Sequence, residues 1–88
     1  MRWTMPSSAQ VSVTTTATRI AKSNGSPLEL KLHCASGALY LDGSTVTSST
    51  GYRMDNGQLL TITLADNDEL WAVTSSGTST LYVLTTVL

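Results

Sequence analysis

Short runs of alternating apolar and polar residues constrain this chain more than any other feature. The clearest run spans residues 28–35, where the even positions 28, 30, 32 and 34 are apolar and the odd positions between them are polar or charged. A period of two is that of a β-strand with one buried face. Similar runs recur roughly every 8–12 residues with turn-forming residues between them, as in a sandwich or small barrel. The chain is therefore expected to be all-β.

The length and composition of the chain agree with one small β-domain. Its 88 residues can build only one core. Fifteen Thr and twelve Ser supply most of the polar surface, and only 12% of the residues are charged. Thr is β-branched and suits a pleated, half-exposed surface. The sequence predicts one antiparallel, jelly-roll-like sandwich or barrel of about seven or eight short strands over residues 10–88.

Residues 1–9 lack periodicity and contain Pro6, Ser7 and Ser8, which indicates a flexible arm. The first six residues have no apolar core of the kind found in signal peptides, so synthesis in the cytoplasm is expected. No apolar run approaches the roughly 20 residues that span a bilayer, so no membrane partner is expected.

Two turns predict β-hairpins. The Ser-Gly turn at 36–37 predicts that residues 28–35 pair with residues 38–42, which places Cys34 beside Leu39 on one face. A one-residue slip would move the leucines to opposite faces, so turn and register support each other.

The Ser-Gly turn at 76–77 predicts a second hairpin, between residues 69–75 and 79–88. Its register would place Trp71 opposite Tyr82, and both faces of this C-terminal ribbon would be largely apolar. A strand that is apolar on both faces is normally buried on both. One face can be the core, and the other would be covered by another chain or by the N-terminal arm.

Few residues suggest catalysis, and no enzyme activity and no cofactor are expected. His33 is the one histidine and therefore the only candidate for a Ser-His-Asp arrangement, but we expect it on the wet face of its strand, stacked on Tyr40. Cys34 is the one cysteine, and alternation points it into the core.

The acidic run at 66–69 has oxygen ligands at close spacing, as a calcium loop would. It lacks the glycine and distal Glu of an EF-hand, and Asp and Asn are ordinary turn residues, so a turn is the preferred interpretation. The five basic residues are scattered and the net charge is −1, so nucleic acid is not an expected partner.

Trp71 and Tyr82 leave three interpretations open: a core aromatic pair, an anchor at a protein interface, or a platform for a sugar ring. The interface and core interpretations carry more weight than glycan binding. An exposed aromatic with polar neighbours would favour the glycan.

Four segments carry a resemblance to a known group of proteins: residues 11–21, the strand end at 39–43, residues 46–52 without Ser48, and residues 68–73. Together they resemble small β-sandwich virion proteins of tailed bacteriophages, which include capsid decoration proteins, head fibres and tail-associated modules. The likeness extends from Val11 to Leu88. It implies assembly as a trimer and no catalytic residues.

The resulting hypothesis is a capsid decoration protein on the virion surface, binding the phage major capsid protein as a homotrimer. Threefold association is motivated by the surplus apolar face of the C-terminal ribbon. The alternative is a receptor-binding or carbohydrate-binding module of a tail or fibre. The expected subunit interface comprises Trp71, Val73, Tyr82, Leu84 and Leu88. The expected capsid contacts are Arg2, Trp3, Met5 and Pro6.

Overall fold

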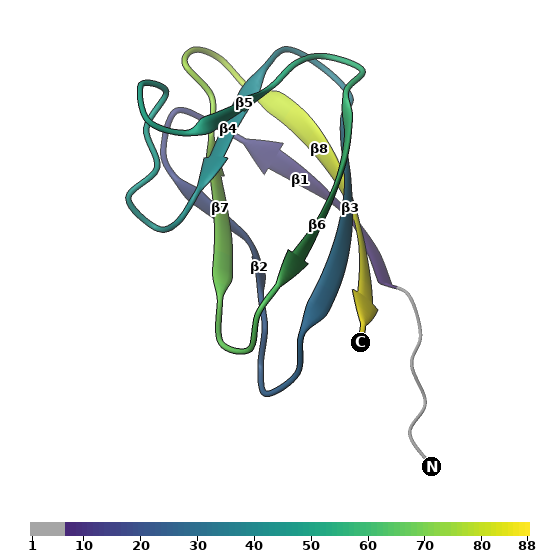
Figure 1. Cartoon of the computed structure of the whole chain (residues 1–88). Helices are drawn as coiled ribbons and strands as arrows, with labels where there is room; N and C mark the ends of the chain where they lie inside the picture. Colours follow the sequence, from purple (N-terminus) through teal and green to yellow (C-terminus); the bar gives the residue numbers. More distant parts are fainter. Residues whose placement is uncertain (1–6) are drawn as a thin grey trace.

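The computed structural model describes residues 7–88, which form two four-stranded antiparallel sheets (Figure 1). No helix occurs within these residues, and the predicted all-β sandwich is confirmed. One sheet has the order β1-β8-β3-β6 and the other has the order β2-β7-β4-β5. The strands are β1 (Ser7–Val13), β2 (Thr18–Lys22), β3 (Leu28–Cys34), β4 (Leu39–Asp42), β5 (Tyr52–Met54), β6 (Leu59–Leu64), β7 (Glu69–Val73) and β8 (Ser79–Val87).

The strand pairing is nested along the chain. β1 pairs with β8, β2 with β7, β3 with β6 and β4 with β5. The additional β3–β8 and β4–β7 ladders roll this long two-stranded ribbon into two sheets. Nested pairs rolled in this way are the jelly-roll topology, which belongs to the class expected from the sequence. Every connection except β4–β5 therefore carries the chain from one sheet to the other.

Both predicted hairpins are wrong, although the four strands assigned to them begin and end within two residues of their expected bounds. β3 and β4 lie in different sheets, as do β7 and β8, so Cys34 does not pair with Leu39 and Trp71 does not pair with Tyr82. Each Ser-Gly turn instead forms an arch, a turn that leads from one sheet to the facing sheet. Cys34 and Leu39 still both point into the core, from opposite sides.

The N-terminal strand begins earlier than expected. β1 starts at Ser7 and pairs with β8 from the Ser7–Thr85 pair onward. Residues 7–9 of the expected arm are thus part of a sheet, because β8 offers their backbone a partner that no local pattern reveals. Residues 1–6 lie outside the described residues.

The core lies between the sheets and is built from the inward positions of both. Three of the four apolar residues of β3 predicted to face inward are less than 3% exposed, and Cys34 is fully buried. The residues of this core are Val13, Leu28, Leu30, Leu32, Cys34, Leu39, Leu41, Met54, Leu64, Leu70, Ala72, Leu81 and Val83. The inward face predicted for residues 28–34 is therefore confirmed.

Buried hydroxyl groups hold two arches together at one end of the sandwich. Thr74, after β7, donates its hydroxyl to the carbonyl oxygen of Ala38 at 2.9 Å, and Ser79 donates to the same oxygen at 3.1 Å. The backbone N–H of Thr74 also donates to the carbonyl of Thr14 at 2.9 Å. An arch has no ladder partner across its own turn, so these side chains satisfy polar groups that a hairpin would have paired.

Gly37 is required by the geometry of the β3–β4 arch. Its φ of 65° lies in the left-handed region, and a Cβ at this position would come within 2.7 Å of the Ser79 hydroxyl oxygen. Gly77, in the β7–β8 arch, has nearly the same φ of 67°, but a Cβ there would meet nothing within 4 Å.

The two glycines provide a matched test of this packing. Gly77→Ala should cost about 1–2 kcal/mol from backbone strain alone. Gly37→Ala should cost about 1–3 kcal/mol more, because the added methyl also overpacks Ser79. Urea unfolding of both variants measures the difference. Adding Ser79→Ala should remove much of the excess cost of Gly37→Ala; purely additive effects would contradict the proposed contact.

Candidate functional site

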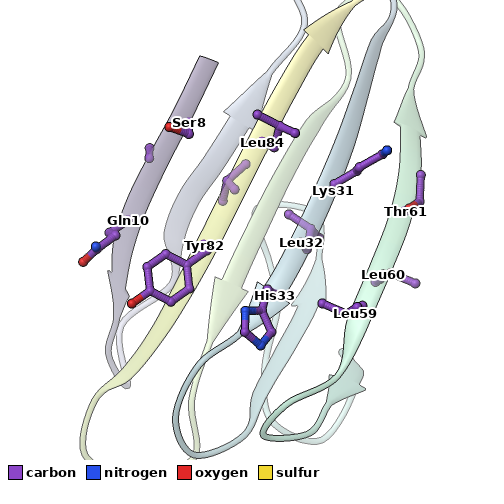
Figure 2. Close-up of a pocket in the computed structure, with 12 residues that line it drawn as sticks. Ser8, Gln10, Lys31, Leu32, His33, Leu59, Leu60, Thr61, Tyr82 and Leu84 are labelled. Carbon is purple, nitrogen blue, oxygen red and sulfur yellow. The ribbon is translucent and has the colours of Figure 1, made fainter. Parts of the chain in front are cut away.

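The candidate site is the outer face of the β1-β8-β3-β6 sheet, here called the β8 face (Figure 2). Side chains from four strands line a shallow groove of about 670 Å³ on it. The outward-facing residues of the β8 face are Ser8 and Gln10 from β1, Tyr82 and Leu84 from β8, Lys31 and His33 from β3, and Leu59 and Thr61 from β6.

Strand alternation places Tyr82 and Leu84 on this face. Their neighbours Leu81 and Val83 are inward, at 0% and 5% exposure, so the even positions of β8 must point outward. Tyr82 and Leu84 remain 39% and 38% exposed. Leu59, at the start of β6, is 73% exposed, because its neighbour Leu60 faces the core between the two sheets.

The register of the ladders brings distant parts of the chain into two rows. Gln10, Tyr82, His33 and Leu59 form one row across the four strands, because each is the register partner of the next. The second row runs through Ser8, Leu84, Lys31 and Thr61 in the same way. Apolar side chains thus occupy positions in both rows, with polar groups beside them.

His33 stacks on Tyr82 and not on Tyr40, which corrects the expected partner. The two ring centroids are 5.8 Å apart and the ring planes differ by 26°. Tyr40 lies in the other sheet, where it is the register partner of Val73. The stack orders Tyr82 between β3 and β1, and Figure 2 shows its ring between His33 and Gln10.

Trp71 lies on the outer face of the opposite sheet, so the expected interface residues do not form one patch. It stands between Arg19 and Asp42, its register partners on β2 and β4. Its indole N–H donates to Glu69 Oε1 at 2.8 Å, and Glu69 Oε2 lies 3.8 Å from Lys22 Nζ. Trp71 is half-buried among polar and charged neighbours.

Val73 lies on that same outer face, beside Tyr40, against which the β4–β5 loop packs. A Cβ on Gly51 would lie 2.7 Å from Tyr40 Cβ and 2.9 Å from Val46 Cγ2, so the loop packs against Tyr40, next to Val73. Val46 and Val73 are both only 5% exposed, yet neither belongs to the core between the sheets. The chain itself therefore covers this part of the expected interface.

The other predicted site residues fall elsewhere. Leu88 is 54% exposed, and its N–H donates to the carbonyl of Pro27 at 3.0 Å. The expected capsid contacts Arg2, Trp3, Met5 and Pro6 lie outside the described residues. Leu59 was not among the residues expected at an interface, although the adjacent pair Leu59-Leu60 was a signal, since two neighbouring leucines must face opposite sides of a strand.

The cysteine and the acidic run that were considered for chemistry lie in the core and at a turn. Cys34 is fully buried, and burial raises the pKa of its thiol, which favours the unreactive neutral form. Residues 66–68 of the acidic run lie in the turn between β6 and β7, with Asn67 at a φ of 70°, and Glu69 begins β7. Within residues 7–88, no group of three or more His, Cys, Asp or Glu side chains could hold a metal ion.

Comparison with known proteins adds no family to this description. The sequence matches no protein-family model, and no curated protein matches it significantly. None of residues 7–88 belongs to a helix that is long and apolar enough to cross a membrane.

Adjacent residues of β8 test which side faces outward. Val83→Thr keeps the side-chain shape but buries a hydroxyl, so it should lower the free energy of unfolding by about 1–3 kcal/mol. Leu84→Thr should change it by less than about 0.5 kcal/mol, because the side chain is half-exposed. Urea denaturation compares the two, and equal losses would contradict the assigned faces.

The buried thiol predicts a loss of stability at alkaline pH. The unfolded chain ionises its cysteine at a pKa of about 8.5, whereas the folded chain holds the Cys34 pKa higher. The stability that the neutral thiol contributes is therefore complete below about pH 8.5 and is lost as the pH rises toward the folded-state pKa. Cys34→Ala should flatten this part of the profile, measured as the midpoint of urea unfolding between neutral and alkaline pH. Identical slopes in the two proteins would contradict the effect.

Proposed function

We propose that this chain is a non-catalytic structural protein of a tailed-phage virion, a capsid decoration protein that associates with its own copies and attaches to a protein surface through the β8 face. The observation that carries the proposal is the group of apolar side chains on that face. Leu59, Tyr82 and Leu84 are all more than a third exposed, although each could have been polar without loss to the core. Grouped apolar residues on a folded surface mark a contact site.

The composition of the β8 face favours a protein partner. Lys31 is the only lysine or arginine that lines the groove in the described part of the chain, which is too little positive charge for a nucleic-acid backbone. Leu59, Leu84 and a tyrosine ordered by stacking provide the apolar centre typical of protein interfaces. Gln10, Ser8 and Thr61 supply polar groups around them.

The contacts of His33 and Cys34 support the proposal that the protein is non-catalytic. His33 is engaged with Tyr82, and the Cys34 thiol is buried with hydrogen bonds to the carbonyls of Ser36 and Gly37. Both residues thus contribute to packing.

The virion assignment depends on the resemblance stated above. The jelly roll supports it only as an analogy, since this fold serves viral capsid and lectin domains alike. In this proposal the N-terminal residues, including Arg2 and Trp3, also contact the major capsid protein. The threefold association expected from the sequence is untested, and β7 and β8 do not form the ribbon with a surplus apolar face that motivated it. The proposal therefore keeps association between copies and sets no copy number.

A second candidate is a carbohydrate-binding or receptor-binding module of a tail or fibre. The exposed ring of Tyr82, with Gln10 and Lys31 on neighbouring strands, favours it. A sugar ring could stack on the tyrosine while its hydroxyl groups bond to the polar side chains.

The capsid proposal predicts a loss of binding when charge enters the β8 face. Purified protein is mixed with particles of the phage that encodes it, prepared without this gene product, and bound protein is measured after sedimentation. Tyr82→Glu combined with Leu84→Glu, both on the internal strand β8, should weaken binding at least about tenfold, the effect of about 1.4 kcal/mol. The control combines Ser48→Glu with Thr78→Glu, which adds the same charge at exposed positions off this face.

Equal binding by the two double variants would refute the role of the β8 face. Failure of the unmodified protein to bind would refute the capsid assignment. Glycan binding that is lost in Tyr82→Ala, without any binding to particles, would establish the second candidate instead.

A further inference from the structure

The two sheets differ in how their edge strands are protected. In the β2-β7-β4-β5 sheet, β2 has a bulge between Arg19 and Ala21 and ends in Lys22, and β5 has only three residues, including Arg53. Bulges, charged side chains and short length are the usual devices that prevent a sheet edge from pairing with another chain. In the other sheet, β6 has six residues, Leu-Leu-Thr-Ile-Thr-Leu, with no charge, proline or bulge.

The hydrogen-bonding groups on the free side of β6 can be assigned from the ladder. The N–H of Cys34 donates to the carbonyl of Gln58, and the N–H of Gly57 donates to the carbonyl of Cys34. A bulge at residues 57–58 thus precedes β6, and it leaves Cys34 and Gln58 as a hydrogen-bonded pair at the start of the β3–β6 ladder. Such pairs alternate in an antiparallel ladder, so Leu60, Ile62 and Leu64 also direct their backbone groups toward β3. The N–H and C=O groups of Leu59, Thr61 and Thr63 therefore point away from the sheet, and no partner for them occurs within residues 7–88.

The side chains of β6 present apolar surface on both sides of this edge. Leu59 and Thr61 line the groove of the β8 face, as Figure 2 shows. On the other side, Leu60 and Ile62 are half-exposed and line a smaller hollow of about 190 Å³ between the two sheets. A strand added beside β6 would place alternate side chains toward these two hollows, the arrangement that β-strand addition uses.

The edge strand β1 does not present comparable apolar surface. Its outward residues Ser8, Gln10 and Ser12 are polar, and β1 continues into residues 1–6, which are not described. Of the two long edges of this sheet, β6 is the one with apolar groups on both sides.

We propose that β6 pairs antiparallel with β6 of a second copy of this chain, which joins two β1-β8-β3-β6 sheets into one continuous sheet of eight strands. The strand is complementary to itself. With Thr61 opposite Thr61 of the other copy, Leu59 lies opposite Thr63, and the outward-pointing backbone groups of these three residues all pair. On the inner side Leu60 meets Ile62, an apolar pair, and no charge faces a like charge within the strand.

Association of copies is part of the proposed function, and this inference rests on it while naming the surface that performs it. The test uses purified protein without capsids. A protein that does not form the dimer could therefore still bind capsids, and a protein that does not bind capsids could still form the dimer.

Proline at the edge tests the backbone pairing. Thr61→Pro removes an N–H that points away from the sheet, so the fold should survive while the dimer is lost. The matched control is Gln10→Pro. The N–H of Ala35 donates to the carbonyl of Thr80, so the even residues of β8 direct their backbone groups toward β3 and the odd residues direct theirs toward β1. Gln10 pairs with an even residue of β8, and its N–H therefore points away from the sheet at the opposite edge. Native mass spectrometry and sedimentation at high micromolar concentration should show a dimer for the unmodified protein and for Gln10→Pro, and a monomer for Thr61→Pro.

A monomeric unmodified protein, a dimer that survives Thr61→Pro, or a dimer that Gln10→Pro abolishes would each overturn the proposal. Thr61→Lys, with Gln10→Lys as its control, serves if the proline variant does not fold. Two lysines directly opposite each other repel across the pair, whereas an exposed lysine is compatible with a strand edge.

Cysteine substitution tests the register. In a Cys34→Ala background, Thr61→Cys should form a disulfide between copies under mild oxidation, because paired Cα atoms about 5.5 Å apart lie in the range for a disulfide. Thr63→Cys should not, since its counterpart lies four residues further along, at about 14 Å. Cross-linking of Thr63→Cys without that of Thr61→Cys would overturn the register.

Discussion

The carbonyl oxygen of Ala38 accepts hydrogen bonds from two buried hydroxyl groups, and this small polar cluster makes the arches of the sandwich possible. A hairpin satisfies its backbone in its own ladder, but an arch separates the two strands that it joins. Thr74 and Ser79 supply the missing partners at one end of the sandwich, and Ser23 does so at the other end. The N–H of Ser23 donates to the carbonyl of Asp68, and its hydroxyl donates to the carbonyl of Ser26. Because these hydrogen bonds satisfy polar groups at both ends of the sandwich, the chain can roll its nested strand pairs into two sheets.

The same arches explain why strand positions were predictable from the sequence and strand partners were not. Alternation in residues 28–34 reports which side chains are inward, and burial confirmed that pattern. It does not report which strand lies alongside. Cys34 and Leu39 face the core whether their strands form a hairpin or an arch. The agreement between turn position and side-chain register therefore could not distinguish a hairpin from an arch. The nested topology depends on contacts between residues far apart in the chain, such as Thr74 with Ala38.

The candidate site was predictable to the same extent. The outward positions of Tyr82 and Leu84 follow from alternation in β8 alone. Their neighbours Gln10, His33 and Leu59 come from three other strands, and only the ladder registers bring them together. Trp71 was grouped with Tyr82 because a hairpin would have paired them, and the two residues lie in different sheets. A residue's face is thus a local property, whereas the membership of a patch depends on topology.

The β8 face and the open edge of β6 belong to one sheet, and their geometry links the two proposals. An antiparallel pair within a continuous sheet has its two-fold axis perpendicular to the sheet, so both copies in the proposed dimer present the β8 face on the same side. Leu59 lies at the junction, on the face and on the edge strand together. Two linked faces binding one surface gain affinity through effective concentration even when each contact is weak. A lattice of repeated capsid sites would favour such a bivalent protein, whereas a single receptor would gain nothing from the second face.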